Sequence, residues 1–547
     1  MRARTASLVL AALAVFHASA AFATAKPAAV DSSSWVDHDG RPVSKPQKHE
    51  KALWAHEFHE GITAPLGHAF DIPDKILWAV GAGYKHRASN VNRYDEVSNS
   101  TWFTNRNHVR PVSLGDIRTG PAGDIEPTPP YVITHGKVGG NNPGFQIKDA
   151  AGKKWVVKLD PPACPQLISG AGAVASRLIS AAGYNQARIV SFRIKPEDLT
   201  IDPDLAAGKK PGEKPFYQSY LDYLLAHSFR YPDGSSSAEA SLFIKGDVLG
   251  PINMRGDRDD DPNDIYKHRN RRELRGLFVL MSWLNSWDTK DPQNLDAFIG
   301  SDSVGHVSHT IVDVDAALGA AGGEPKPPIR GFEYTIDWGW AMKRVLTLGF
   351  ITEPWRKTNE ETGIPSAGHI ESEIYDPHAF RTLQPQPAFR ERTLGDCYWG
   401  AKVVCSFSDA QIRAAVEGAH YDDPKATEFL TKMLIERRDK VGRYWFSRVT
   451  PVDYFQVDGG TLRFRDLAVD RRLADARHYK VEVKSAKSAT RTIDLADTKL
   501  ALSQLGKATG DVKLVFRVAS GESEPTFLTL RKTGDSWNIL EVRHADM

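Results

Sequence analysis

The chain has 547 residues, a formal net charge of +2, 41% hydrophobic residues and 25% charged residues. This length exceeds what one compact hydrophobic core accommodates, so we expect several domains. The ordinary composition excludes a largely disordered chain, and the nearly balanced charge gives no electrostatic reason to expect a nucleic-acid partner.

Residues 1–25 have the pattern of a secretory signal peptide. Two arginines precede an apolar stretch over 8–16, and a small-x-small cleavage motif ends at Ala23. The apolar stretch is too short to span a bilayer, and no later segment is long and apolar enough to do so. We therefore expect an exported protein, periplasmic or extracellular and soluble, with no transmembrane segment after signal cleavage.

Residues 26–127 lack a sustained hydrophobic period and carry frequent turn signals, which predicts an extended lead-in that wraps the next domain. Ser113 predicts the cap of a short helix within it. Asp95, Glu96 and Arg106 resemble a polar site, but charges satisfied inside a packed segment explain them more simply.

The segment from Tyr131 to Asp160 predicts a three-stranded meander, because β-branched and aromatic residues alternate and glycine-containing turns separate three short runs. The first turn contains Gly139, Gly140 and Gly144. Without a Cβ, such a turn lets backbone N–H groups approach a phosphate, although most glycine-rich hairpin turns only reverse the chain.

Lys158 lies inside the third predicted strand, between apolar neighbours. A lysine in this position needs an anionic partner or a path to solvent, because burying an unpaired charge is costly. The helix predicted next, over 169–184, contains no acidic residue. Further along, the sequence predicts a turn over 231–237 and a strand over 241–246.

The segment 271–319 has the clearest chemical pattern. A long helix with apolar periodicity is predicted to end at Trp287, and a β-like run over 309–312 follows and leads into Asp313. The polar residues between helix and strand include Asp288, Lys290, Gln293 and Asn294. Helix, acidic loop, strand and second acid form the layout of a phosphoryl-transfer site. Taken singly, Asp288 is explained equally well as a residue that closes a helix, and Asp313 as a turn carboxylate.

Other catalytic and metal patterns have little support. The acidic loop from Asp257 departs from a calcium loop, because Pro262 and His268 occupy the positions that require Gly and Glu. No GxSxG or HExxH motif indicates a hydrolase. Cys397 and Cys405 are close enough in sequence to pair in an oxidising compartment, which leaves the third cysteine single; no cysteine and histidine set indicates structural zinc.

After a helix predicted over 424–446, six short alternating segments separated by turns predict a small all-β sandwich near the C-terminus.

The chain resembles a largely uncharacterised family of exported bacterial proteins with a kinase-like core, similar to HipA-like and phosphatidylinositol-kinase-like folds. The resemblance covers about 71–464 and is carried by stretches such as GKVGGNNPGFQIKDAAGKKWVVKLDPP, WLNSWDTKDPQNLD and VDVDAALG. It implies a two-lobed protein-kinase-like core, so that together with the alternating C-terminal segments we expect an α+β protein with such a core and a C-terminal all-β sandwich. The sequence patterns and the resemblance together predict a signal peptide (1–25), a lead-in (26–127), a kinase-like N-lobe (128–245), a helical kinase-like C-lobe (246–455) and a small β-sandwich (456–547).

The resemblance also implies ATP and Mg²⁺ as cofactors. Gly139, Gly140, Gly144 and Lys158 would bind the nucleotide. Asp288 and Lys290 would be catalytic, and Gln293, Asn294 and Asp313 would hold the metal. Three positions depart from the kinase pattern: Gly172 replaces the expected helix glutamate, Gln293 stands where the metal-binding asparagine is expected, and Asp315 replaces a glycine.

Two functions follow as hypotheses. The first is an ATP- and Mg²⁺-dependent phosphotransferase with an unknown protein, lipid or glycan acceptor. The alternative is a catalytically inactive kinase-like binding protein of the cell envelope, favoured by the departures from the motif and by the scarcity of ATP outside the cytoplasm. The C-terminal β unit carries no catalytic motif and suits recognition of a surface partner by analogy.

Overall fold

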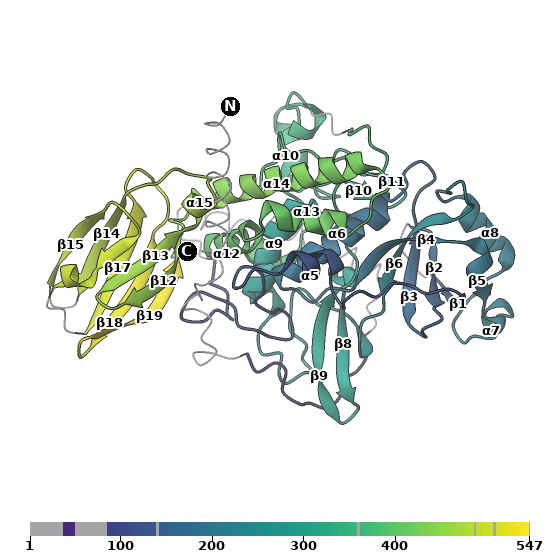
Figure 1. The fold of residues 1–547 in the computed structure, drawn as a ribbon, viewed down its shortest axis with the longest axis horizontal. Coiled ribbons are helices and arrows are strands. Elements are labelled where there is room, and N and C mark those ends of the chain that lie inside the picture. The colour runs from purple at the N-terminus through teal and green to yellow at the C-terminus, as the bar shows by residue number, and fades with distance from the viewer. Residues whose placement is uncertain are drawn as a thin grey trace, which may run out of the picture.

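The computed structural model describes residues 37–49, 85–137, 142–357, 361–485, 488–506 and 510–545. The signal peptide predicted over 1–25, together with Gly139 and Gly140, lies outside these ranges. Figure 1 shows an elongated molecule with sheets towards both ends and helices between them. The fold is mixed α+β.

The first sheet has six strands in the order β4-β6-β3-β2-β1-β5. Their bounds are β1 (Tyr131–Gly136), β2 (Gly144–Lys148), β3 (Lys154–Leu159), β4 (Ile189–Ile194), β5 (Leu199–Ile201) and β6 (Ser236–Leu242). The predicted meander is confirmed, since β2 pairs antiparallel with both β1 and β3. The strand predicted over 241–246 was misplaced: β6 begins earlier, because its run of serine and alanine residues shows no alternation of large apolar and polar side chains.

Helix α6 (Leu167–Ala182) packs on this sheet, and each of its residues is buried. Its small residues permit close approach: a Cβ at Gly170 would lie 2.4 Å from the Tyr421 ring. The helix ends at Gly183, whose φ of 131° favours glycine. The predicted cap of α5 (Leu114–Thr119) is also confirmed, because the Asp116 backbone N–H donates to Ser113 Oγ at 3.0 Å.

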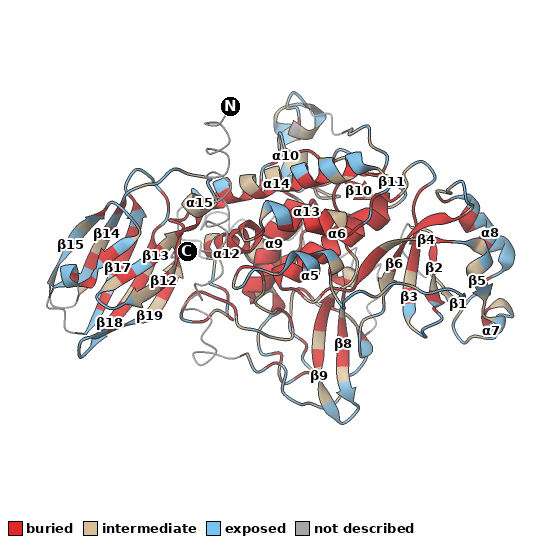
Figure 2. Ribbon diagram, in the orientation of Figure 1, coloured by how far each residue is buried: buried red, intermediate tan, exposed pale blue. Residues whose placement is uncertain are grey.

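The helical part of the molecule is built around a wholly buried helix, α9 (Arg272–Leu284). It packs against α12 (Leu394–Cys405) and α14 (Pro424–Phe446), and α13 (Asp409–Glu417) packs on α14. Figure 2 shows that buried residues concentrate on α6, α9 and α12. A Cβ at Gly276 would lie 2.6 Å from the Trp399 ring, so this glycine permits the close packing of α9 on α12. Helix α9 ends before the predicted Trp287, because Asn285 adopts a left-handed conformation.

Beside the helices lies a three-stranded sheet in the order β7-β8-β9. Its strands are β7 (Asp247–Pro251), β8 (Asn294–Ser301) and β9 (Val304–Ile311). The smaller elements are α7 (Pro203–Ala206), α8 (Gln218–Ala226), β10 (Ala320–Ala321), β11 (Glu324–Pro325), α10 (Trp338–Leu346), α11 (Pro387–Glu391) and α15 (Leu467–Asp470). Within the described ranges, no helix is both long and apolar enough to cross a membrane.

The C-terminal strands form two sheets, in the orders β12-β13-β16 and β15-β14-β17-β18-β19. Their bounds are β12 (Val452–Asp458), β13 (Thr461–Asp466), β14 (Tyr479–Ser485), β15 (Ser488–Leu495), β16 (Lys499–Ala501), β17 (Asp511–Val518), β18 (Thr526–Thr533) and β19 (Ser536–His544). The sheets share one hydrophobic core, in which the Phe455 and Phe464 rings lie 5.3 and 5.2 Å from that of Phe516.

Buried ion pairs connect this C-terminal part to the helices. Asp95 contacts Arg272 of α9 at 2.8 Å and accepts the His544 backbone N–H at 2.9 Å. Lys402 of α12 bonds Glu96 and contacts Asp453 of β12 at 2.8 Å. The interpretation of Asp95 and Glu96 as satisfied structural charges is therefore confirmed.

The three cysteines are free thiols. Cys397 and Cys405 lie eight residues apart in the single helix α12. A rise of about 1.5 Å per residue separates their Cα atoms by about 12 Å, well beyond the reach of a disulfide. The pairing that proximity in sequence suggested is therefore wrong.

Candidate functional site

Lys158, on β3, is surrounded by three carboxylates. Its Nζ lies 2.7 Å from Asp313, 3.0 Å from Asp315 and 3.4 Å from Glu239. Burial by itself would lower the pKa of Lys158, but the three carboxylates outweigh it and hold the pKa well above its ordinary value. The prediction that Lys158 needs an anionic partner is confirmed, with partners from two separate parts of the chain.

Glu239 of β6 takes the place of the acid that α6 lacks. It is fully buried and faces Gly172, where a Cβ would lie 2.4 Å from Glu239 Oε2. A glycine at this position of α6 thus leaves room for the carboxylate. Lys158 therefore has a glutamate partner, and this glutamate comes from a strand rather than from the helix in which the resemblance placed it.

The carboxylates around Lys158 carry more negative charge than it neutralises. Burial raises the pKa of Glu239 to about 8, against the opposing effect of Lys158. Burial and the neighbouring Asp313 charge raise the pKa of Asp315 to about 6. Burial opposes the ionisation of Asp313 as well, but Lys158 holds the pKa of that group below its ordinary value. A further cation would relieve this repulsion.

The Asp288 loop lies next to Asp313. Gln293 Nε2 donates to Asp288 Oδ2 at 2.9 Å, and Lys290 Nζ lies 3.3 Å from Asp288 Oδ1. The Val312 backbone N–H donates to the Gln293 carbonyl at 2.9 Å, which fixes this loop against the end of β9. Burial raises the pKa of Asp288, and the Asp313 charge adds to the shift.

Several buried oxygen atoms around these residues lack hydrogen-bond donors within the part of the chain that the structure describes. They are Asn142 Oδ1, Glu239 Oε1 and Oε2, Asp288 Oδ1, Gln293 Oε1 and Asn294 Oδ1. Lys158 and Lys290 approach two of them only at ion-pair distances. Buried acceptors of this kind are costly unless something positive binds them. Carboxylate and amide oxygens are the ligands that Mg²⁺ prefers, so this donor set fits a hard divalent cation.

The β1–β2 turn ends against the same carboxylates. Asn142 Nδ2 donates to Asp315 Oδ2 at 2.7 Å, and Lys137 Nζ donates to the Asn142 carbonyl at 2.7 Å. Gly144 pairs with Lys158 in the sheet, and a Cβ there would lie 2.1 Å from the Val157 carbonyl oxygen. The visible role of Gly144 is therefore close pairing of β2 with β3.

The structure thus brings Lys158, Asp288, Lys290, Gln293 and Asp313 into one connected region. Asn294 joins it through the bond from its Nδ2 to the Lys290 carbonyl at 2.8 Å. Sequence reasoning missed Glu239, although an acid between two alanines in a strand was a usable signal. It also missed Asn142, for which the sequence carried no signal beyond the turn itself.

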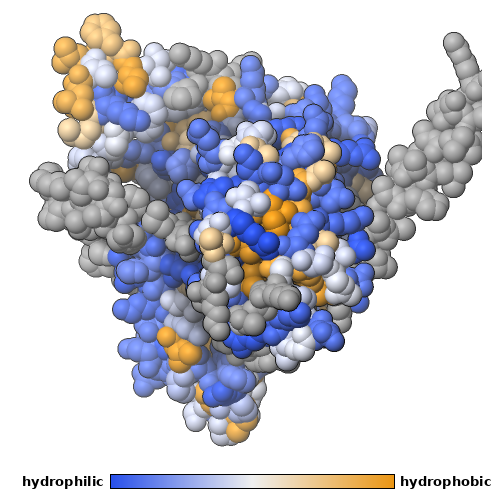
Figure 3. All heavy atoms as spheres, turned by 90° about the vertical axis from the view of Figure 1, so that its left-hand side faces the viewer, coloured by the Kyte–Doolittle hydropathy of each residue, from blue (hydrophilic) through white to orange (hydrophobic). Residues whose placement is uncertain are grey.

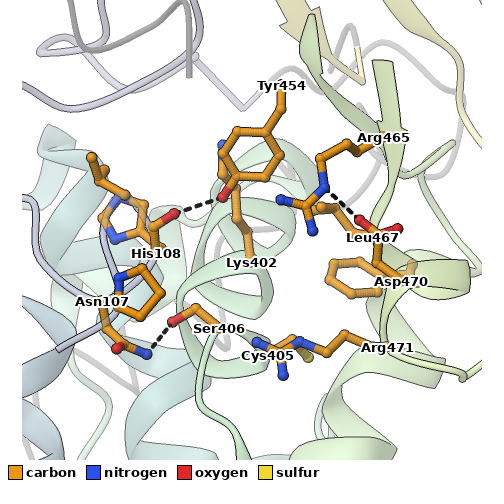
Figure 4. Close-up of a pocket in the computed structure, with 13 residues that line it drawn as sticks. Asn107, His108, Lys402, Cys405, Ser406, Tyr454, Arg465, Leu467, Asp470 and Arg471 are labelled. Carbon is orange, nitrogen blue, oxygen red and sulfur yellow. Dashed lines mark hydrogen bonds and ion pairs between the residues drawn. The ribbon is translucent and has the colours of Figure 1, made fainter. Parts of the chain in front are cut away.

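A small cavity lies between α12 and the C-terminal strands. Its volume is about 50 Å³, and its walls bond to one another: Tyr454 Oη donates to the His108 carbonyl at 2.7 Å, and Asn107 Nδ2 donates to Ser406 Oγ at 2.9 Å (Figure 4). Ligand pockets typically measure about 300–1,000 Å³, so this cavity is too small for a nucleotide.

Neither a family model nor a curated protein sequence matches this chain. Among solved structures, two of the Golgi casein kinase align over 60% of this chain with a TM-score of 0.27. The structure with Mn/ADP bound has 12% identity over 75% of its own chain, and the other has 11% identity over 74%. A TM-score this low assigns neither fold nor function, so the chemistry of the site depends on this chain's own residues.

Proposed function

We propose that this protein is exported, has a two-lobed kinase-like core, and binds ATP with Mg²⁺ at the Lys158 site as a phosphotransferase. The observation that carries the proposal is the cluster of Lys158 and three carboxylates beside buried oxygens without donors. A buried lysine is suited to bind phosphate oxygens, and buried oxygens without hydrogen-bond donors are suited to hold the accompanying cation.

Each residue has a separate task in this proposal. Lys158 would bind phosphate oxygens, while Asp313 and Asn294 would hold the cation. Gln293 would serve twice, because its Nε2 positions Asp288 and its Oε1 remains available as a ligand. When bound, Mg²⁺ supplies positive charge that offsets the charge of a transferred phosphoryl group.

Asp288 would orient and deprotonate the acceptor hydroxyl. Its raised pKa makes it a better proton acceptor than an ordinary aspartate, and the ion pair with Lys290 holds it in place. The same contacts favour the alternative, a kinase-like binding protein without catalysis, since Lys290 and Gln293 already engage Asp288. The acceptor, whether protein, lipid or glycan, is left open by both forms of the proposal.

Nucleotide binding is tested by melting the mature protein with and without Mg–ATP. Saturation at one hundred times Kd would stabilise the folded state by about 2.7 kcal/mol and raise the melting temperature. We expect Lys158→Met to abolish this rise and Lys154→Met, an exposed position on the same strand, to retain it. Circular dichroism checks that both variants fold. An equal rise in Lys158→Met, or no rise in the wild type, would refute nucleotide binding at this site.

Catalysis is tested with γ-labelled ATP and a cell-envelope extract. We expect label transfer that falls about a hundredfold or more in Asp288→Asn, because proton transfer by a positioned base contributes about that much. The same variant would keep the Mg–ATP melting shift. Full transfer by Asp288→Asn would contradict the role of Asp288. A melting shift without transfer by any form of the protein would establish the binding protein instead.

A further inference from the structure

A larger cavity lies on the side of α6 that faces β8 and β9. It has a volume of about 470 Å³. Its walls are residues between 106 and 122, the C-terminal half of α6 with the segment 184–188, the end of β6 with residues 243–245, and residues of β8 and of β9. None of its lining residues belongs to the Lys158 site. A cavity of this volume is in the usual range for a small-molecule site.

Three arginines line this cavity, namely Arg106, Arg177 and Arg188. They donate mainly to backbone carbonyls: Arg106 Nη1 to Ser180 at 2.5 Å, Arg177 Nε to Arg118 at 2.8 Å, and Arg188 Nη1 to Thr119 at 2.6 Å. Within the described ranges, Arg106 and Arg177 make no ion pair, and Arg188 reaches only the exposed Asp124, at 3.7 Å. Among the described residues, Asp124 therefore compensates only part of the positive charge of the three arginines.

The electrostatics agree with this shortage. Burial lowers the pKa of all three guanidinium groups, to about 10 for Arg177, and the Arg188 charge lowers that of Arg177 further. The negative charges of Asp124 and Glu126 oppose the effect of burial on the pKa of Arg177 and Arg188 but do not outweigh it. An anion bound in the cavity would compensate the remaining positive charge of the three arginines.

Gln186 is a second, independent indication of a ligand-binding site. It lines the cavity, is only 9% exposed, and neither its Nε2 nor its Oε1 has a hydrogen-bond partner among the described residues. A buried amide normally satisfies both groups, because leaving them unpaired is costly. Gln186 thus offers a donor and an acceptor beside the arginines.

The remaining walls are partly apolar. Ile299 and Phe243 line the cavity with Tyr184, whereas Asp116 is the only acidic side chain among the lining residues that the structure describes. We propose that this cavity binds a small organic anion, in which a phosphate or carboxylate meets the arginines and an apolar body contacts these walls. Guanidinium groups bind both kinds of oxyanion in the same forked geometry.

The cavity is also connected to the Lys158 site through α6. Arg177 and Ser180 face the cavity, and Gly172, on the same helix, packs against Glu239. The proposed anion site does not depend on nucleotide binding, because its residues and its ligand are separate from those of the Lys158 site.

The test is calorimetric titration of the full mature chain with phenyl phosphate, benzoate and neutral benzamide. We expect phenyl phosphate or benzoate to bind and benzamide to show no binding. Whether phenyl phosphate or benzoate binds more tightly shows whether the cavity prefers a phosphate or a carboxylate. Arg106→Gln is expected to weaken that anion by about tenfold or more, since it removes a charged hydrogen-bond donor. Arg110→Gln, an exposed neighbour outside the cavity, is the matched control and is expected to bind as the wild type does.

Two further variants keep the result interpretable. Asp116→Asn is expected to tighten anion binding severalfold, because it removes the one negative charge from the wall. Lys158→Met, checked for folding by circular dichroism, is expected to leave it unchanged. Absence of binding by both anions would overturn the proposal. So would full binding by folded Arg106→Gln, or loss of binding in Lys158→Met alone, which would assign the anion to the Lys158 site.

Discussion

Glu239 is the residue whose ionisation the fold opposes most clearly at the Lys158 site. It is fully buried, and burial raises its pKa from 4.5 to about 8. Between these two values the folded protein retains a proton that the unfolded chain has released. The stability that this bound proton contributes is therefore fully present below pH 4.5 and is lost as the pH rises from 4.5 to about 8.

Glu239→Gln is predicted to remove this dependence, because a glutamine cannot lose the proton. Near pH 5 the variant and the wild type are expected to melt at similar temperatures. Near pH 8.5, in chelator, the variant is expected to be more stable by about 1 kcal/mol or more, since one pKa unit corresponds to about 1.4 kcal/mol. Melting curves at both pH values measure the difference. A variant that is less stable at pH 8.5 than at pH 5, relative to the wild type, would contradict the burial argument.

Gly172→Ala is predicted to disturb the same contact from the helix side. The new Cβ would lie 2.4 Å from Glu239 Oε2 and 3.2 Å from Ile189 Cγ2. Overpacking of this kind costs about 1–3 kcal/mol, and we expect a lower melting temperature together with a smaller Mg–ATP shift.

Gly115→Ala is the matched control for that substitution. Gly115 is also in a helix, but its nearest neighbouring atom would be 3.8 Å from a Cβ. Alanine is favoured over glycine in helices by about 1 kcal/mol, so this variant is expected to be neutral or more stable. Equal losses in both variants would show that the glycine of α6 has no special packing role.

Among the elements, α10 and the segment after it stand out by their exposure. No residue of α10 is buried, and Leu346, Leu348 and Phe350 are 76%, 84% and 88% exposed. Figure 3 shows apolar side chains gathered at the top of the molecule, where Figure 1 places α10. Two ion pairs hold the helix in place, because Arg344 contacts Glu333 at 2.8 Å and Glu353 at 2.5 Å.

Leu348→Ser and Phe350→Ser are therefore predicted to change stability by no more than about 0.5 kcal/mol. Leu280→Ala in the buried helix α9 is the comparison, for which about 2–5 kcal/mol is expected, because it leaves a cavity in the core. The melting temperatures of the three variants measure these differences in stability. A loss for Leu348→Ser as large as that for Leu280→Ala would mean that this surface is covered in the folded protein.

On the scale of the whole molecule, the C-terminal sheets are joined to the helices by buried charges. Lys402→Met would leave the carboxylates of Glu96 and Asp453 without their lysine. Breaking a buried ion pair in this way costs about 3–5 kcal/mol, and we expect a correspondingly lower melting temperature. Lys432→Met, whose side chain is 76% exposed on α14, is expected to change little. Similar melting of the two variants would show that the junction contributes no stability.

The local sequence pattern was sufficient to predict several elements of the fold. The meander of β1 to β3, the cap of α5 and the bounds of α14 followed from alternation, capping and helical periodicity, all of which depend on neighbouring residues. The requirement that Lys158 have an anionic partner also followed from the sequence, because its strand neighbours are apolar. The sequence failed where these cues are weak, as in the small-residue strand β6.

The sequence by itself therefore determined several local elements and the need of Lys158 for an anionic partner. Only the tertiary structure decided that Glu239 meets Lys158, because β6 reaches β3 across a separation of about eighty residues and nothing local identifies such a partner. The same holds for the arginine cavity, whose walls come from five separate segments. Pairing of buried charges is set by the packing of distant elements, since each charge must find its counter-charge wherever the fold excludes water.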